Sequence, residues 1–148
     1  MKREWPPLLS AGLHRLSATE CRQLILQARS GDDVAHCSHL WDQLTHFRGL
    51  IAALGGTGRW WIDGSMLTLK PQPSDIDCVW WPDLNCATAL VPHGVQLDHW
   101  FQHGAARALF KVDAHLDVAW QVDKVQYWQR TFGRARSGQS KGIVELLP

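Results

Sequence analysis

Two aspartates, Asp75 and Asp77, interrupt an apolar run that otherwise has the composition of a buried β-strand. Side chains two residues apart on a strand point to the same side, about 7 Å apart along the chain, so the two carboxylates face the same way. Like charges at that separation repel each other unless a cation neutralises them. Mg²⁺ or Mn²⁺ suits this task, because hard divalent cations prefer carboxylate oxygens and keep positions open for phosphate. The pair therefore predicts a metal site.

A Gly-Ser pair, Gly64 and Ser65, stands shortly upstream of the aspartates. Glycine lets the backbone approach a ligand closely, and its neighbouring N–H groups can cradle phosphate oxygens. Serine adds a hydroxyl donor. A phosphate cradle followed by a carboxylate pair is what metal-assisted phosphoryl or nucleotidyl transfer requires.

The alternative interpretation of this stretch is a turn followed by an edge strand with exposed acids. Aspartate is a poor strand former, and the apolar neighbours Ile76, Cys78 and Val79 make an accidental surface strand unattractive. We therefore favour the functional interpretation. Asp63, directly before Gly64, is more typical of a turn-stabilising side chain than of a ligand.

The elements that must position these residues follow from the hydrophobic pattern. Helices are predicted at residues 17–29, 34–54, 97–109 and 123–131. Strands are predicted at residues 59–62, 75–81, 110–118 and 142–147. Residues 6–16 read as an extended lead-in that lies across the body. The expected fold is α/β (α+β), a mixed β-sheet packed by helices, with the Gly-Ser turn after one strand and the aspartates on the next.

The strand at residues 110–118 offers a third carboxylate. Its apolar and polar residues alternate, so Asp113 and Asp117 share the polar face. Spacing alone does not separate these two aspartates.

Composition limits the classes of protein to consider. The 148 residues fit a single domain, expected to span residues 1–148. Fifteen basic and fourteen acidic residues nearly cancel, so no strong overall field attracts nucleic acid or membrane. No apolar run approaches the roughly 20 residues of a membrane helix, and the charged N-terminus does not resemble a signal peptide. A cytoplasmic protein without a membrane partner is expected.

Three further groups of residues each allow a structural and a functional interpretation. The four cysteines lack metal-site spacing and are expected to be free thiols, mostly buried. The pairs His36–His39 and His99–His103 could share a metal, but neither has a third ligand at a telling spacing. The basic tail is either a solvated loop or a basic segment near the phosphate site or an acidic partner; its cations are Arg130, Arg134, Arg136 and Lys141.

The motifs together resemble a known superfamily. "DGS" followed by "PSDIDCVW" is similar to the signature of the DNA polymerase β-type nucleotidyltransferases, in which a Gly-Ser turn precedes a D-x-D on the second strand. The chain also resembles a group of small, uncharacterised bacterial nucleotidyltransferase-like proteins over most of its length. The segments concerned are "PPLLSAGLHRLSATE", "WIDGSMLTLKPQPSDID", "ALFKVD" and "RTFGRARSGQSKGIVEL".

The resemblance implies a minimal nucleotidyltransferase core and a role for each site residue. Gly64 and Ser65 would contact the triphosphate, Asp75 and Asp77 would hold the metals, and Asp113 would be the third carboxylate. Lys70 departs from the pattern, because many members have a glycine there. It is either a further nucleotide contact or a solvated loop residue.

The implied function is a Mg²⁺-dependent (or Mn²⁺-dependent) nucleotidyltransferase. It would move a nucleoside monophosphate from a nucleoside triphosphate, such as ATP, to a hydroxyl of a protein, an RNA end or a small molecule. Small proteins resembling this one often belong to toxin–antitoxin or defence systems, which implies a partner protein. Two alternatives stay open. One is a catalytically weak module of the same fold that binds nucleotide or protein, and the less favoured one is a two-metal nuclease, which would leave Gly64 and Ser65 without a role.

Overall fold

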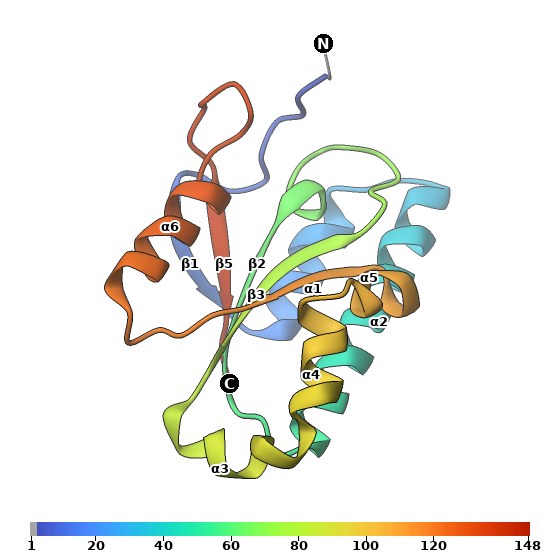
Figure 1. The fold of residues 1–148 in the computed structure, drawn as a ribbon. Coiled ribbons are helices and arrows are strands. Elements are labelled where there is room, and N and C mark those ends of the chain that lie inside the picture. The colour runs from blue at the N-terminus through green and yellow to red at the C-terminus, as the bar shows by residue number, and fades with distance from the viewer. Residues whose placement is uncertain (1–2) are drawn as a thin grey trace.

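A five-stranded mixed sheet forms the centre of the computed structural model, which describes residues 3–148 (Figure 1). Its strands are β1 (Gly12–Leu16), β2 (Gly58–Asp63), β3 (Ile76–Pro82), β4 (Val112–Leu116) and β5 (Gly142–Leu146). Their spatial order is β1-β5-β2-β3-β4. The pairs β1–β5 and β3–β4 are parallel, whereas β2 runs antiparallel to both β5 and β3.

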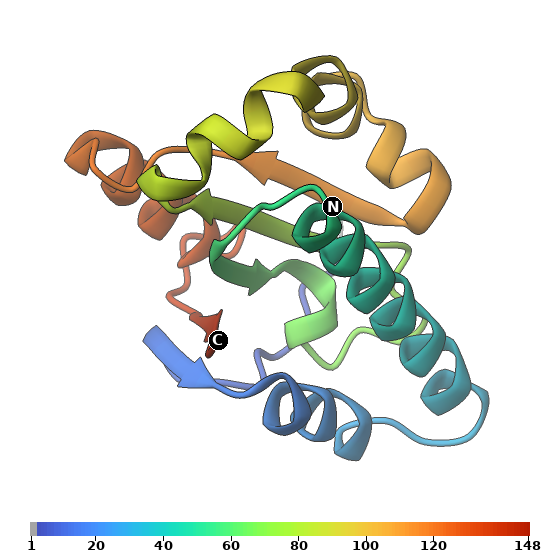
Figure 2. The same cartoon turned by 90° about the horizontal axis from the view of Figure 1, so that it is seen from below.

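Helices pack on both faces of this sheet (Figures 1 and 2). They are α1 (Ala18–Gln27), α2 (Asp32–Ala53), α3 (Ala87–Leu90), α4 (Gly94–Phe101), α5 (Ala105–Phe110) and α6 (Val122–Phe132). Helices α1, α2, α4 and α5 lie on one side, and α6 lies on the other. The predicted α/β fold, a mixed sheet packed by helices, is confirmed.

The two Trp doublets show how the sheet joins two cores. Neighbouring strand residues point to opposite faces, so Trp60 and Trp80 join the larger core beside α2, and Trp61 and Trp81 join the smaller core under α6. All four rings are buried. Both rings of each doublet are therefore core residues.

Local sequence signals explain where the first two helices form. Ser17 and Glu20 make a reciprocal capping box at the start of α1, with the Glu20 N–H 3.1 Å from the Ser17 hydroxyl. Helix α2 presents one apolar stripe to the sheet, and six of its residues are buried, namely Cys37, Leu40, Trp41, Leu44, Phe47 and Ile51. All four cysteines are buried free thiols, as predicted.

Three element predictions need correction. The expected lead-in contains strand β1, which pairs with β5, a long-range partner that its own sequence does not indicate. The single helix expected at 97–109 is two helices, α4 and α5, separated at Gly104, which has a left-handed φ of 72°. The strand expected at 110–118 begins only at Val112, because Phe110 still belongs to α5, and it ends at Leu116.

Within residues 3–148, no helix is both long and apolar enough to cross a membrane.

Candidate functional site

Strand register brings three carboxylates side by side at one end of the sheet. Asp77 on β3 lies opposite Asp63 at the end of β2 and opposite Asp113 on β4. Side chains at paired positions of neighbouring strands point to the same face, and the strands lie about 4.8 Å apart. Three acidic groups therefore form a row across β2, β3 and β4.

All six residues predicted for the site line one cleft at this end of the sheet. The cleft has a volume of about 550 Å³. Its lining includes the predicted metal ligands Asp75, Asp77 and Asp113 and the predicted nucleotide contacts Gly64, Ser65 and Lys70. Gly64 and Ser65 begin the 3₁₀ turn η1 (Gly64–Leu67), which directly follows β2. Residues separated by up to 49 positions in the sequence thus meet at one place.

Asp77 lies at the centre of the acidic row. Burial raises the pKa of its carboxyl to about 7, and the neighbouring charges of Asp75, Asp113 and Asp63 add to this effect. No hydrogen bond or ion pair joins its carboxylate to any residue between 3 and 148. A half-buried acid among other acids and without a partner is suited to hold a cation.

Gly64 is required by the position of the Asp77 carboxylate. Its φ is +80°, which side chains rarely allow, and a Cβ atom there would overlap Asp77 Oδ2. The sequence predicted that this glycine lets a ligand approach the backbone. In the structure, the group that lies against Gly64 is the carboxylate of Asp77, which is itself a candidate metal ligand.

Two cations neutralise the neighbouring aspartates Asp63 and Asp75. Lys141 Nζ lies 2.9 Å from Asp63 Oδ2, and Arg107 Nη2 lies 2.8 Å from Asp75 Oδ2. Asp63 is buried, and its second oxygen, Oδ1, has no hydrogen-bond partner within the described part of the chain. Burial raises the pKa of Asp63, and Lys141 partly opposes that shift. Sequence reasoning missed Arg107 altogether, because a lone arginine in a short helix has no distinguishing pattern.

The structure separates the two candidates for the third carboxylate. Asp113 lines the cleft and pairs across the strands with Asp77. Asp117 lies beyond the end of β4, and its carboxylate accepts hydrogen bonds from Trp128 Nε1 and from the Val118 N–H, each at 3.0 Å. Asp117 therefore links α6 to the end of β4, and of the two candidates Asp113 is the one that lines the cleft.

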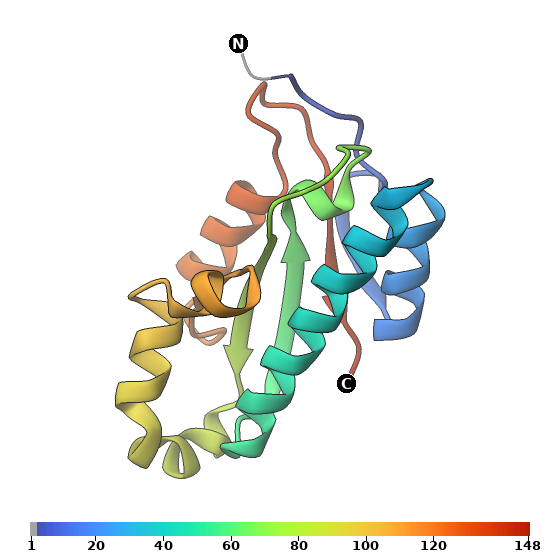
Figure 3. The same cartoon turned by 90° about the vertical axis from the view of Figure 1, so that its right-hand side faces the viewer.

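The basic tail forms one wall of the cleft. Residues 133–141 fold into a hairpin, here called the tail hairpin, closed by a bridge between Arg134 and Ser140. It lies beside the N-terminal segment (Figures 1 and 3), and the Ser137 N–H donates to Glu4 Oε1. Arg136 and Lys141 of this hairpin line the cleft. These two cations therefore share the cleft with the predicted phosphate contacts Gly64 and Ser65.

The cleft combines an acidic floor with basic walls. The floor is the group of Asp75, Asp77 and Asp113, and the cations around it are Arg3, Lys70, Arg107, Arg136 and Lys141. Opposite charges arranged in this way match a ligand that is itself a cation bound to an anion, such as a metal–triphosphate complex.

A divalent metal fits the chemistry of this floor, although the side chains are not yet arranged around one point. Among residues 3–148, no three His, Cys, Asp or Glu side chains form a ready-made metal site. Asp75 is paired with Arg107. The unpartnered Asp77 beside Asp113 gives the best pair of ligands, and Asp75 would complete the set on leaving Arg107.

The histidine pairs have other contacts. His36 Nε2 lies 2.6 Å from the Pro73 carbonyl oxygen, and His103 Nε2 lies 2.9 Å from the carboxylate of Asp98.

The fold and the cleft define an α/β protein with a carboxylate cluster at one end of a mixed sheet. The chain belongs to a family of unknown function, DUF6932, whose model matches residues 3–147. Neither the curated proteins nor the solved structures contain a match to it.

Proposed function

We propose that this protein is a metal-dependent nucleotidyltransferase, which moves a nucleoside monophosphate from a nucleoside triphosphate to an acceptor hydroxyl and releases pyrophosphate. One observation supports this most strongly. Asp77 and Asp113 lie at paired positions on neighbouring strands, and the Asp77 carboxylate lies against Gly64 of the Gly-Ser turn that follows β2. The resemblance of the same residues to the DNA polymerase β-type signature agrees with that geometry.

The acidic floor would hold Mg²⁺ or Mn²⁺. Asp77 and Asp113 would provide two of its oxygen ligands, and Asp75, which forms an ion pair with Arg107, would provide a further one. A bound divalent cation lowers the charge of the phosphates and orients them for in-line displacement. Asp113 would accept the proton of the attacking hydroxyl, so that the acceptor oxygen would bond to the α-phosphorus as pyrophosphate leaves.

The walls of the cleft would hold the triphosphate. The backbone N–H groups around Gly64 and the Ser65 hydroxyl supply hydrogen bonds at the end of β2. Lys70, Arg107 and Arg136 supply positive charge around the same space. Arg107 forms an ion pair with Asp75 and also lines the cleft, so it would contact phosphate if Asp75 served as a metal ligand.

The near balance of acidic and basic residues favours a protein or a small molecule as the acceptor over a long nucleic acid, which requires an extended basic groove. An RNA end stays among the acceptors to be tested. The toxin–antitoxin or defence setting that the resemblance implies would supply either a target protein or a regulatory partner.

The test is a transfer assay with each labelled nucleoside triphosphate, Mg²⁺ or Mn²⁺, and a host lysate. We expect label to appear on one acceptor class and Asp113→Asn to lower transfer by at least about a hundredfold, because that change removes the proton acceptor. Asp117→Asn is the matched control. Its carboxylate faces Trp128 instead of the cleft, so transfer should be kept. Transfer lost in Asp117→Asn and kept in Asp113→Asn would contradict the assignment.

A second candidate function is a module that binds nucleotide or protein without turnover. The ion pairs of Asp75 with Arg107 and of Asp63 with Lys141 favour it, because the chain's own cations neutralise two of the four aspartates Asp63, Asp75, Asp77 and Asp113. Nucleotide binding by the wild type together with no transfer from any nucleoside triphosphate would support this candidate.

A further inference from the structure

Arg29 is a buried arginine just past the end of α1, outside the cleft. Its side chain is only 1% exposed. A buried guanidinium is costly unless its charge and its donors are satisfied, so the contacts that compensate it define what this residue does.

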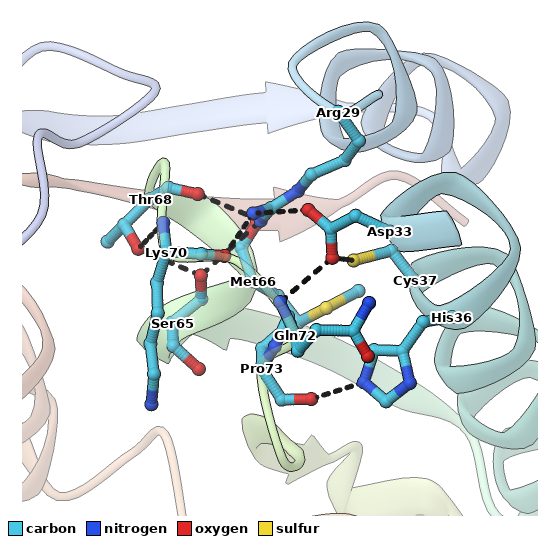
Figure 4. A network of polar contacts seen from close by, with 10 residues as sticks. All are labelled: Arg29, Asp33, His36, Cys37, Ser65, Met66, Thr68, Lys70, Gln72 and Pro73. Atoms are coloured by element: carbon cyan, nitrogen blue, oxygen red, sulfur yellow. Dashed lines mark hydrogen bonds and ion pairs between the residues drawn. The ribbon is translucent and has the colours of Figure 1, made fainter. Parts of the chain in front are cut away.

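Nearly all of those contacts are backbone carbonyl groups of one segment (Figure 4). Arg29 Nη2 donates to the carbonyls of Thr68 at 2.8 Å and Met66 at 3.1 Å, and Nη1 donates to the carbonyl of Lys70. A single planar guanidinium thus binds alternate carbonyls along residues 66–70. Because it binds backbone and not side chains, it fixes the path of this segment whatever its side chains are.

Helix α2 continues the same network. Asp33 forms an ion pair with Arg29, with 3.5 Å between Nη1 and Oδ2, and its Oδ1 accepts a hydrogen bond from the Gln72 N–H at 2.9 Å. One turn further along the helix, His36 contacts the Pro73 carbonyl. The segment between η1 and β3 is therefore held at both ends by the junction of α1 and α2 (Figure 4).

This segment contains much of the candidate nucleotide site. It follows η1, which carries Gly64 and Ser65, and it contains Lys70 and ends at Asp75. The Lys70 carbonyl faces Arg29, whereas its side chain extends away from the network (Figure 4) and lines the cleft. The direction of that side chain thus depends on where Arg29 holds the backbone.

We infer that Arg29 is a positioning residue, which orders residues 65–75 so that Ser65, Lys70 and Asp75 face the metal–nucleotide complex. The inference rests on the proposed function for the ligand, but the ordering of the segment can be measured without it. A displacement of about 1 Å in a positioning group can lower activity by two orders of magnitude, so a loop left to move freely would be costly for function.

The experiment compares Arg29→Met with Phe132→Leu. Phe132 is buried in the small core under α6, on the opposite face of the sheet. Each variant is studied at the same interval below its own Tm, so that a general loss of stability affects both equally. We measure backbone hydrogen exchange over residues 65–75 and the affinity for ATP in the presence of Mg²⁺.

We expect Arg29→Met to speed exchange at Gln72 and to weaken ATP binding by about tenfold or more, because the carbonyls and Asp33 lose their shared partner. Phe132→Leu should leave both unchanged. Arg29→Lys, which keeps the charge but offers fewer aligned donors, should give an intermediate loss of affinity. If Arg29→Met does not fold, Arg29→Lys and Asp33→Asn provide the same comparison.

Equal losses in Arg29→Met and Phe132→Leu would overturn the inference, because Arg29 would then act only through stability. Rapid exchange of residues 65–75 in the wild type would also overturn it. A wild type that shows slow exchange there but binds no ATP would contradict the proposed function and leave the ordering by Arg29 supported.

Discussion

At the scale of single residues, most of the proposed chemistry depends on Asp77. It is half-buried, lies between two other aspartates in the strand register, and has a pKa raised to about 7. In the metal-free protein near neutral pH this carboxyl is partly protonated, whereas a bound cation would favour the charged form. The same group is thus unfavourable for folding and favourable for binding.

This conflict predicts how stability depends on pH without metal. The folded-state pKa of Asp77 lies above the unfolded value of about 4, so its contribution to stability falls as the pH rises from about 4 to about 7. Asp77→Asn, which has no charge to bury, should therefore stabilise the protein in EDTA at pH 8, by about 1–3 kcal/mol, and change little at pH 4. Thermal or urea unfolding of both proteins at the two pH values measures this.

Added Mg²⁺ provides the internal check. It should restore much of the wild-type stability at pH 8 and leave Asp77→Asn unaffected. If Asp77→Asn were less stable than the wild type at pH 8 in EDTA, burial and the neighbouring aspartates would not raise the pKa of Asp77 in the folded protein.

The sequence predicted the residues of the acidic floor because their chemistry is unusual for their context. Aspartates inside an apolar strand and a Gly-Ser pair before them stand out without any structure. The ion pairs around this floor could not be predicted in the same way. Arg107 and Lys141 reach Asp75 and Asp63 only through the packing of α5 and the tail hairpin, and no local pattern encodes such contacts.

The tail hairpin is the element whose role the structure changes most. As a sequence it is a basic, glycine-containing stretch, typical of a solvated loop. Its position beside the N-terminal segment and against the acidic floor makes it a wall of the cleft. Strand β1 is a similar case, since its pairing with β5 joins residues about 130 positions apart.

The position of this hairpin predicts a difference between two neighbouring arginines. Arg136 lines the cleft, while Arg134, on the same hairpin, is not among the described residues that line it. Arg136→Ala should lower the affinity for ATP with Mg²⁺ by about threefold to tenfold, because one exposed charge near phosphate is worth about 1 kcal/mol. Arg134→Ala should have no effect at the same salt concentration. Titrations at low and high salt should show the difference shrinking as salt screens the charge, and equal affinities of the two variants would exclude the hairpin from the phosphate site.

At the scale of the whole molecule, the residues that stabilise the fold lie on the two faces of the sheet, and the residues proposed for the chemistry lie at one end of it. Its two faces are covered by the larger core beside α2 and the smaller core under α6, and both are filled with apolar and aromatic residues. The acidic and basic groups gather at one end, where β2 ends and β3 and β4 begin. The fold class was predictable because apolar periodicity reports which faces are buried, whereas the strand order depends on long-range pairing that periodicity does not encode.

The central claim is that the acidic floor binds nucleotide through a divalent metal, and calorimetric titration of ATP tests it most directly. The titration is run at pH 7.5 on the wild type and Asp77→Asn, each with Mg²⁺ and with EDTA. We predict that the wild type binds ATP with Mg²⁺ and binds it at least about tenfold more weakly in EDTA, and that Asp77→Asn binds it weakly in both, because the metal links the floor to the phosphates. Equal ATP affinity of the wild type with and without Mg²⁺, or an Asp77→Asn variant that binds like the wild type, would contradict the account.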